Sequence, residues 1–330
     1  MIPFGAGPFA LPADLRLLLT GATGFFGRAV LRHFIDTAPS GHVVALARNP
    51  EAFLARYPEF SNLPWLEFHR GDILYRQTLP QASFSHVIHA AADSTGGTTL
   101  NAIERFHQIV GGTENMLEWA VANGVRRFLY VSSGAIYGTQ PPDVERLPED
   151  WMGAPPPELS EAAYGNAKRA AECLCALYAE RNSLEPVIAR GFAFVGQDLP
   201  LDAHFAIGNF IRDAVAAPEI RVNGDGSPLR SYLHQEDLAD WLLRMLLHGR
   251  PGRCYNLGSD IVVSISELAQ LVRDVIAPRK PVRILGASAA GGLRSRYVPD
   301  ISRARQELGL TVRIGLAEAI EKTWRQLPPR

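Results

Sequence analysis

The stretch LLLTGATGFFGRAV, residues 17–30, decides the fold of this chain. A continuous apolar run is broken by closely spaced glycines and then gives way to a helical pattern. A buried strand, a tight glycine turn and a helix together let backbone N–H groups approach a pyrophosphate, whose charge is favoured at a helix N-terminus. The stretch therefore predicts a dinucleotide site. The residues expected to line it are Gly21, Thr23, Gly24, Phe25, Phe26 and Gly27.

Apolar segments of strand length recur after this first one. They stand at residues 42–48, 64–72, 84–92, 125–133 and 185–191, and helical patterns separate several of them. Continuous apolar strands that alternate with helices indicate a parallel sheet covered on both faces. We therefore expect an α/β fold, a Rossmann-like doubly wound parallel sheet with a smaller C-terminal substrate lobe.

The pattern changes after Gly191, where proline- and glycine-rich loops separate shorter elements. We expect residues 1–190 to form an NAD(P)-binding Rossmann domain. Residues 191–330 would then form mainly a substrate-binding lobe, partly interleaved with the sheet. The proline-rich, acidic segment 139–160 predicts a surface loop between a strand and a helix.

The composition excludes several classes of protein. The chain has 330 residues, and 33 Lys plus Arg balance 34 Asp plus Glu, which argues against a nucleic-acid partner. No apolar run approaches the ~20 residues of a membrane span, and the N-terminus lacks the basic region of a signal peptide, so we expect a cytoplasmic protein. The three cysteines form no disulfide framework, and no residue spacing predicts a metal site.

Residues at the ends of the expected strands indicate the type of cofactor. The second strand ends at Arg48 and Asn49 with no acid before Glu51, and an arginine at this point accommodates the 2′-phosphate of NADP. A solvated surface arginine is the alternative, and NAD stays possible. The third strand ends with Asp72 and Ile73, and an acid there can bond adenine. Small residues follow the fourth strand, where the cofactor would cross the sheet edge: Ala90, Ala91 and Ala92.

A second group of residues has the chemistry of proton transfer. Tyr164 and Lys168 stand four residues apart on a helical pattern and therefore share one face. An ammonium beside a phenol favours the tyrosinate, so Tyr164 could exchange a proton with a substrate oxygen, and Lys168 could also bond the nicotinamide ribose. Ser133 ends the fifth strand, at the sheet edge where doubly wound folds bind ligands, and could bond the same oxygen. A surface pair and an ordinary turn serine are the alternatives.

With these motifs the chain resembles the extended short-chain dehydrogenase/reductases, the NAD-dependent epimerase/dehydratase family. The resemblance covers residues 15–327 and rests on TGATGFFG, GDI, HAAA, VSSGAIYG, YGNAK, YNLGS and PDISRARQELGL. It implies that Ser133, Tyr164 and Lys168 are the catalytic set. It also implies a homodimer built through two helices, here residues 102–122 and 161–182.

Within this family, the segment GDGSPLRSYLHQEDLAD points to a nucleotide-diphosphate sugar as substrate. The resemblance implies that Arg230 pairs with the diphosphate, which suits its bidentate guanidinium, and that Asn209 lies near it. Sugar 4,6-dehydratases carry acidic residues directly after the catalytic hydroxyl residue, where this chain has Gly134 and Ala135. Dehydration is therefore not expected. Two further family asparagines are replaced, by Ile109 and Ala193.

Three functions stay open at this point. In the first, NADPH reduces a 4-keto nucleotide sugar while Tyr164 protonates the new hydroxyl. In the second, a nucleotide-sugar epimerase uses the same residues and retains its NAD(P). The third is a catalytically inert NADP-sensing protein, which the presence of Ser133, Tyr164 and Lys168 argues against. The arginine at position 48 favours the first.

Overall fold

A seven-stranded parallel sheet forms the centre of the molecule. The computed structural model describes residues 11–12, 14–37, 41–92, 100–203, 205–286 and 295–327. The strand order is β11-β6-β5-β4-β1-β2-β3. The strands are β1 (Arg16–Thr20), β2 (His42–Ala47), β3 (Leu66–Arg70), β4 (His86–His89), β5 (Arg127–Ser133), β6 (Glu185–Gly191) and β11 (Cys254–Leu257). All adjacent pairs in this sheet are parallel, which confirms the doubly wound α/β fold.

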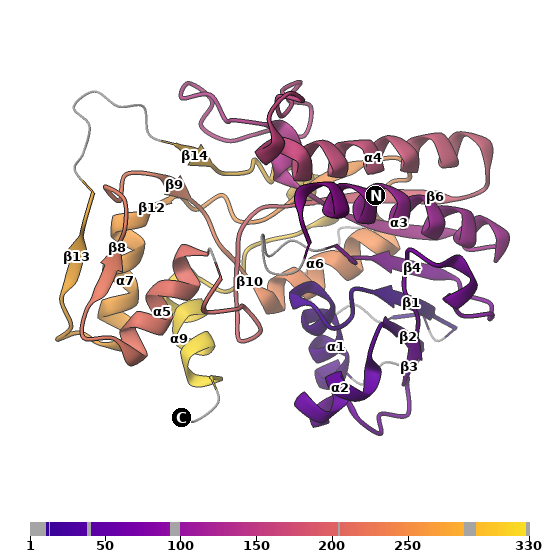
Figure 1. Cartoon of the computed structure of the whole chain (residues 1–330), viewed down its shortest axis with the longest axis horizontal. Coiled ribbons are helices and arrows are strands. Elements are labelled where there is room, and N and C mark those ends of the chain that lie inside the picture. The colour runs from indigo at the N-terminus through magenta and orange to yellow at the C-terminus, as the bar shows by residue number, and fades with distance from the viewer. Residues whose placement is uncertain are drawn as a thin grey trace.

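Helices cover both faces of the sheet because its strands are apolar on both sides. Along β1, Leu17 and Leu19 face one hydrophobic core and Leu18 faces the other. The first core packs α1 (Phe25–Thr37) against α6 (Gln235–His248). The second packs α3 (Ala102–Ala122) against α4 (Ala163–Arg181), and these two helices lie side by side in Figure 1. The α3 and α4 bounds agree with the two helices expected to form a homodimer, which itself stays a prediction.

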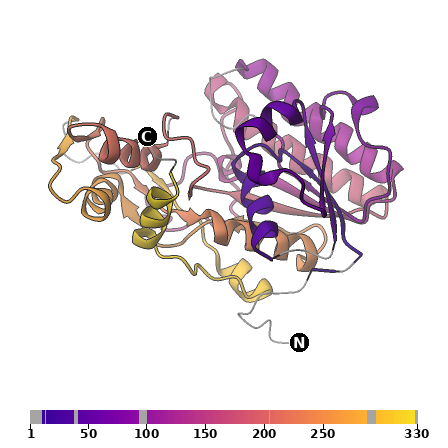
Figure 2. The same cartoon turned by 90° about the horizontal axis from the view of Figure 1, so that it is seen from below.

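Elements from the C-terminal half build a second body beside the sheet (Figure 2). Its hydrophobic core packs three helices and a short strand: α5 (Ala206–Ala216), α7 (Ile265–Ile276), α9 (Leu316–Arg325) and β8 (Ile220–Val222). However, α6 and β11 pack in the sheet body although they follow Gly191 in the sequence, and the expected division into two domains stays a prediction.

The remaining elements of the described chain are short. The remaining strands are β7 (Phe194–Val195), β9 (Leu229–Arg230), β10 (Leu233–His234), β12 (Val263–Ser264), β13 (Val282–Ile284) and β14 (Arg296–Tyr297). The remaining helices are α2 (Pro50–Arg56), α8 (Ser302–Leu308) and the 3-10 turns Pro58–Phe60, Arg76–Thr78, Gly134–Tyr137 and Ser160–Ala162. Strand β9 pairs with both β12 and β14, and this small sheet brings the C-terminal segment across the second body.

The expectation of a surface loop at 139–160 is wrong for several of its residues. Leu147 is fully buried, and Gln140 and Glu149 are also buried. Leu147 exchanges backbone hydrogen bonds with Val298 and Asp300, both at 2.9 Å. The segment therefore ties the turn after β5 to the chain that follows β14, because its buried backbone groups need partners there.

Candidate active site

The glycine turn after β1 is shaped by close backbone contacts. Gly21 has φ +70°, and a Cβ at that position would lie 2.6 Å from the carbonyl group of Ala90. A Cβ on Gly27 would lie 2.4 Å from the carbonyl oxygen of Gly21. A side chain at position 21 would collide with the backbone after β4, and one at position 27 would collide with the backbone at Gly21. Both positions therefore require glycine.

The first turn of α1 is open to a ligand. Thr23 and Gly24 are exposed, Phe25 and Phe26 are half-buried, and a Cβ on Gly24 would meet nothing closer than 3.3 Å. No acidic side chain lies in this turn. Unpaired N–H groups at a helix N-terminus attract anions, so the turn fits the pyrophosphate of a dinucleotide.

The carboxyl end of β2 carries an uncommitted positive charge. Arg48 is exposed, and no hydrogen bond or ion pair joins its side chain to the part of the chain that the structure describes. Asn49 instead has a local role, since its side chain accepts a 3.1 Å hydrogen bond from the Ala52 N–H and caps α2. Both residues are expected at the adenosine ribose. Arg48 has no charged partner among the described residues, whereas the side chain of Asn49 already caps α2.

The other strand ends lie along the same edge of the sheet. Asp72 is half-buried, and one carboxylate oxygen accepts a 3.0 Å hydrogen bond from the Leu74 N–H. Ile73 is buried against Gly112 of α3. Ala90, Ala91 and Ala92 are half-buried directly after β4, and the Ala91 N–H bonds to the Thr20 hydroxyl. Small side chains there leave the edge open beside the glycine turn.

The three expected catalytic residues come from two adjacent elements. Ser133 ends β5, is buried, and accepts a 3.2 Å hydrogen bond from the Ala135 N–H. Tyr164 and Lys168 lie one turn apart at the start of α4, which packs along β5. The side chain of Lys168 is buried, and its ammonium donates a 2.7 Å hydrogen bond to the Val131 carbonyl oxygen.

Burial controls the charge of Lys168. Removal from water lowers the pKa of its ammonium to about 7, although the carboxylate of Glu172 opposes that change. The ammonium also lies 4.9 Å from the centre of the Tyr130 ring. A lysine that titrates near neutral pH can alternate between its two forms, which suits a group that assists proton transfer.

The structure adds a residue that the sequence patterns missed. The Tyr297 phenol lies beside Ser133 and near Tyr164. It donates a 3.4 Å hydrogen bond to the Gly191 carbonyl oxygen. Burial raises the pKa of this phenol, whereas Ser133 lowers it. No local pattern marks Tyr297, because it reaches the site on a two-residue strand that pairs with β9, where Tyr297 lies opposite Arg230, 67 residues earlier.

Tyr297 and its neighbour Phe192 fill the space next to Ser133. Their rings pack against each other with centres 4.6 Å apart and planes tilted by 33°. A Cβ on Gly134 would lie 2.6 Å from the Tyr297 hydroxyl oxygen and 2.8 Å from the Phe192 ring. Position 134 therefore has no room for a side chain, and this explains physically why glycine follows the serine.

Arg230 and Asn209 lie in the second body. Arg230 is opposite Tyr297 in the β9–β14 pair, which brings it to the neighbourhood of Ser133. Its guanidinium bonds only to backbone carbonyl oxygens among the described residues, at 2.8 Å from Leu229 and 3.4 Å from Ser295. Asn209 lies on α5, where its side-chain oxygen accepts a 3.0 Å hydrogen bond from Arg212. No hydrogen bond among the described residues joins Asn209 to Arg230.

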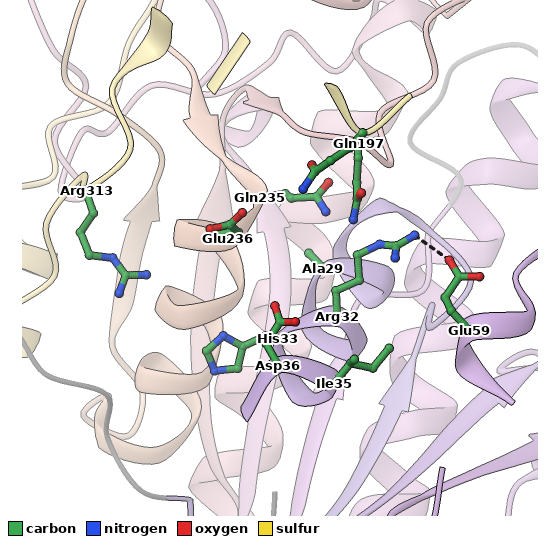
Figure 3. Close-up of a pocket in the computed structure, with 11 residues that line it drawn as sticks. Ala29, Arg32, His33, Ile35, Asp36, Glu59, Gln197, Gln235, Glu236 and Arg313 are labelled. Atoms are coloured by element: carbon green, nitrogen blue, oxygen red, sulfur yellow. Dashed lines mark hydrogen bonds and ion pairs between the residues drawn. The ribbon is translucent and has the colours of Figure 1, made fainter. Parts of the chain in front are cut away.

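A cavity of about 380 Å³ lies away from these residues. Figure 3 shows it between α1, the N-terminus of α6 and the segment before α9, with Arg32, Glu236 and Arg313 among its lining residues. Several of its charged lining residues are paired, as in the 3.0 Å contact of Arg32 with Glu59. It contains none of the predicted site residues, so we do not assign the reaction to it.

The described residues also contain no cluster of three or more His, Cys, Asp or Glu side chains that could hold a metal ion. A transmembrane helix is likewise absent from the described segments, where no helix is both long and apolar enough.

Three comparisons relate the chain to known proteins. The sequence profile of the NAD dependent epimerase/dehydratase family matches residues 17–258. The chain is similar to UDP-glucuronic acid decarboxylase 1 of Danio rerio, 28% identical over 312 residues, which cover 93% of this chain and 71% of that protein. It is 26% identical to UDP-arabinose 4-epimerase 1 of Arabidopsis thaliana, over 95% of this chain and 80% of that one. Among solved structures, MoeE5 in complex with UDP-glucuronic acid and NAD superposes with TM-score 0.76 at 26% identity, covering 94% and 98% of the two chains.

Proposed function

Since this chain belongs to the NAD-dependent epimerase/dehydratase family, we propose that it uses NADPH to reduce the 4-keto group of a nucleotide-diphosphate sugar. The family assignment makes the chain an NAD(P)-dependent enzyme. The proposal is supported by MoeE5, a similar protein that was solved with NAD and a nucleotide sugar bound together. The choice of NADPH, of the 4-keto substrate and of the direction of reaction is our own inference.

The residues around Ser133 support a proton-transfer step. When bound, the nicotinamide cofactor supplies a hydride to the keto carbon. Tyr164 would donate its phenolic proton to the ketone oxygen as that oxygen gains charge, and Ser133 would donate a hydrogen bond to the same atom. Lys168 in its ammonium form would stabilise the tyrosinate that remains. The second body would contribute Arg230 to the diphosphate, because its guanidinium has no carboxylate partner among the described residues.

The observation that carries the proposal is the uncommitted guanidinium of Arg48. It stands at the carboxyl end of β2, where an arginine accommodates the 2′-phosphate of NADP, and no described acid neutralises it. NADPH is the reduced cofactor suited to net reduction, in which each turnover releases an oxidised cofactor and takes up a reduced one.

The surroundings of Ser133 argue against a dehydratase. Such an enzyme needs an acid near the catalytic hydroxyl residue to protonate and expel the leaving hydroxyl. Here Gly134 and Ala135 stand in that place, and the Tyr297 and Phe192 side chains occupy the adjoining space. A larger side chain at position 134 would displace both of them.

A nucleotide-sugar epimerase is the second candidate. It is favoured by the similarity to UDP-arabinose 4-epimerase 1. An epimerase would use the same Ser133, Tyr164 and Lys168 to remove and return a hydride at C4, and it would keep its cofactor through the whole cycle. The two functions therefore differ in cofactor exchange and not in catalytic residues.

The test that separates them is the cofactor content of the purified protein. The protein is denatured, and the released nucleotide is identified and quantified by chromatography. The reductase predicts a largely empty site that then binds added NADPH in preference to NADH. Nearly one retained NAD or NADP per chain would contradict it and favour the epimerase. Loss of carbon dioxide from UDP-glucuronic acid in the same preparation would also contradict it.

A further inference from the structure

Behind the candidate catalytic residues lies a buried ionic cluster centred on Glu172. The Glu172 carboxylate accepts hydrogen bonds from the Arg190 guanidinium, at 2.7 Å to one oxygen and 3.1 Å to the other. The Ser132 hydroxyl donates a further short hydrogen bond to the same carboxylate. Glu172 is 8% exposed. Three elements, α4, β5 and β6, are thus joined at one carboxylate.

Arg190, the partner of Glu172, is itself held in place by further hydrogen bonds. Arg190 donates 2.8 Å hydrogen bonds to the Tyr137 hydroxyl and to the Glu149 carbonyl oxygen. The Tyr137 hydroxyl in turn donates to the Asn256 side chain at 2.8 Å. Glu172 is therefore held by Ser132 on β5 and Arg190 on β6, and Arg190 is itself anchored by its own hydrogen bonds. Fixed charges act on their neighbours without the cost of reorienting.

Glu172 also shares a helix face with the candidate catalytic pair. Tyr164, Lys168 and Glu172 follow one another at four-residue spacing along α4, and residues at that spacing are neighbours on the helix surface. Among the charged groups that act on Lys168, Glu172 has the largest effect on its pKa. Glu172 therefore lies one helical turn beyond Lys168, and Tyr164 lies one turn before it.

The other groups around Lys168 are uncharged at neutral pH. Burial lowers the pKa of His89 on β4 to about 3, so its ring is neutral. Burial raises the pKa of the Tyr130 phenol on β5 and of the Cys175 thiol on α4, so both keep their protons. Arg190 faces Glu172 rather than Lys168. Glu172 is thus the group that can balance the buried ammonium.

We propose that Glu172 is a positioning residue for the Tyr164–Lys168 pair: held by Arg190 and Ser132, its carboxylate stabilises the ammonium form of Lys168, which in turn favours ionisation of Tyr164. The inference rests on the proposed function for the role of these two residues in turnover. The coupling of the three ionisable side chains along α4 does not itself depend on the substrate.

The experiment measures the ionisation of Tyr164 directly in the full-length protein. Phenolate absorbance is titrated against pH, with Tyr164→Phe as the blank, in the unaltered protein and in Glu172→Gln. The glutamine keeps the size of the side chain and removes its charge. We expect the Tyr164 midpoint to rise by at least about one pH unit. Without the Glu172 carboxylate, the ammonium form of Lys168 is less stable, and an opposite charge next to an ionisable group shifts its pKa by roughly 1–3 units. An unchanged midpoint in folded Glu172→Gln would overturn the proposal.

Asp240→Asn is the matched control. Asp240 forms a similarly buried ion pair with Arg244 on α6, with both oxygens 3.1 Å from the guanidinium nitrogen. This variant should lose thermal stability and leave the Tyr164 midpoint unchanged. An equal shift in both variants would mean that general loosening moves the midpoint, and the proposal would be wrong.

A second variant covers the case in which Glu172→Gln does not fold because Arg190 loses its partner. Glu172→Gln combined with Arg190→Gln leaves no unpaired charge and should show the same upward shift, and its absence would overturn the proposal. These titrations use no sugar or cofactor. The proposed function can therefore fail, through the cofactor test, while the coupling stands, and the reverse also holds.

Discussion

The ammonium of Lys168 donates a 2.7 Å hydrogen bond to the carbonyl oxygen of Val131, two residues before Ser133 on β5. This bond connects the helix that carries Tyr164 to the strand that carries the serine. It also places a titratable cation in a buried position, since Lys168 is 4% exposed. The candidate active site is therefore an assembly of a strand end and a helix start, with one buried titratable cation between them.

Tyr164→Phe removes the proposed proton donor and keeps the ring. We expect turnover to fall by at least about 10²-fold, because general acid–base catalysis contributes typically ~10²–10⁴-fold. Binding of NADPH, measured by fluorescence titration, should change by no more than a factor of a few. Turnover close to that of the unaltered protein would remove Tyr164 from the mechanism.

Lys168→Met tests the buried ammonium through the pH dependence of stability. The folded pKa of Lys168 is about 7, below its unfolded value of 10.5, so the unfolded chain binds one more proton between these limits. Its contribution to the free energy of unfolding therefore rises with pH from about 7 to about 10.5, by up to about 1.4 kcal/mol per pH unit. The methionine variant should lose this rise in chemical denaturation curves. An identical pH profile in the two proteins would contradict the assignment.

Arg48→Asp tests the cofactor preference. A charge-assisted hydrogen bond contributes about 1.5–3 kcal/mol, so NADPH should bind roughly 10–100-fold more weakly while NADH binding changes little. Arg16→Asp is the control, because Arg16 is also exposed but begins β1 at the opposite edge of the parallel sheet. Equal weakening of both cofactors by Arg48→Asp would exclude contact with the 2′-phosphate.

Gly134→Ala tests the crowding around Ser133. The added methyl group would lie 2.6 Å from the Tyr297 hydroxyl oxygen and 2.8 Å from the Phe192 ring, so these side chains must shift. We expect a lower melting temperature and a loss of turnover of at least about tenfold, since a 1 Å misplacement can cost up to ~10²-fold. Gly315→Ala should leave turnover unchanged, because a Cβ there would meet nothing within 4 Å. Full activity of Gly134→Ala would show that the serine tolerates displacement of its aromatic neighbours.

The sheet and its helices could be predicted because their signals are local. Buried parallel strands are continuous apolar runs, and the glycine turn after Thr20 and the four-residue spacing of Tyr164 and Lys168 are also contained in short segments. The same spacing extends to Glu172 and could have indicated it. Tyr297, Arg190 and the buried part of the 139–160 segment could not be found in this way. Their positions depend on contacts between segments far apart in the chain, for which no local pattern exists.

The most direct test of the proposed function is a turnover measurement with a 4-keto nucleotide-diphosphate sugar and excess NADPH. We expect NADPH to be consumed over many cycles, one hydroxyl sugar to form per NADPH oxidised, and a deuteride from labelled NADPH to appear at C4. If the sugar inverts its configuration at C4 with no consumption of NADPH, or if no keto sugar reacts, the reductase is the wrong assignment.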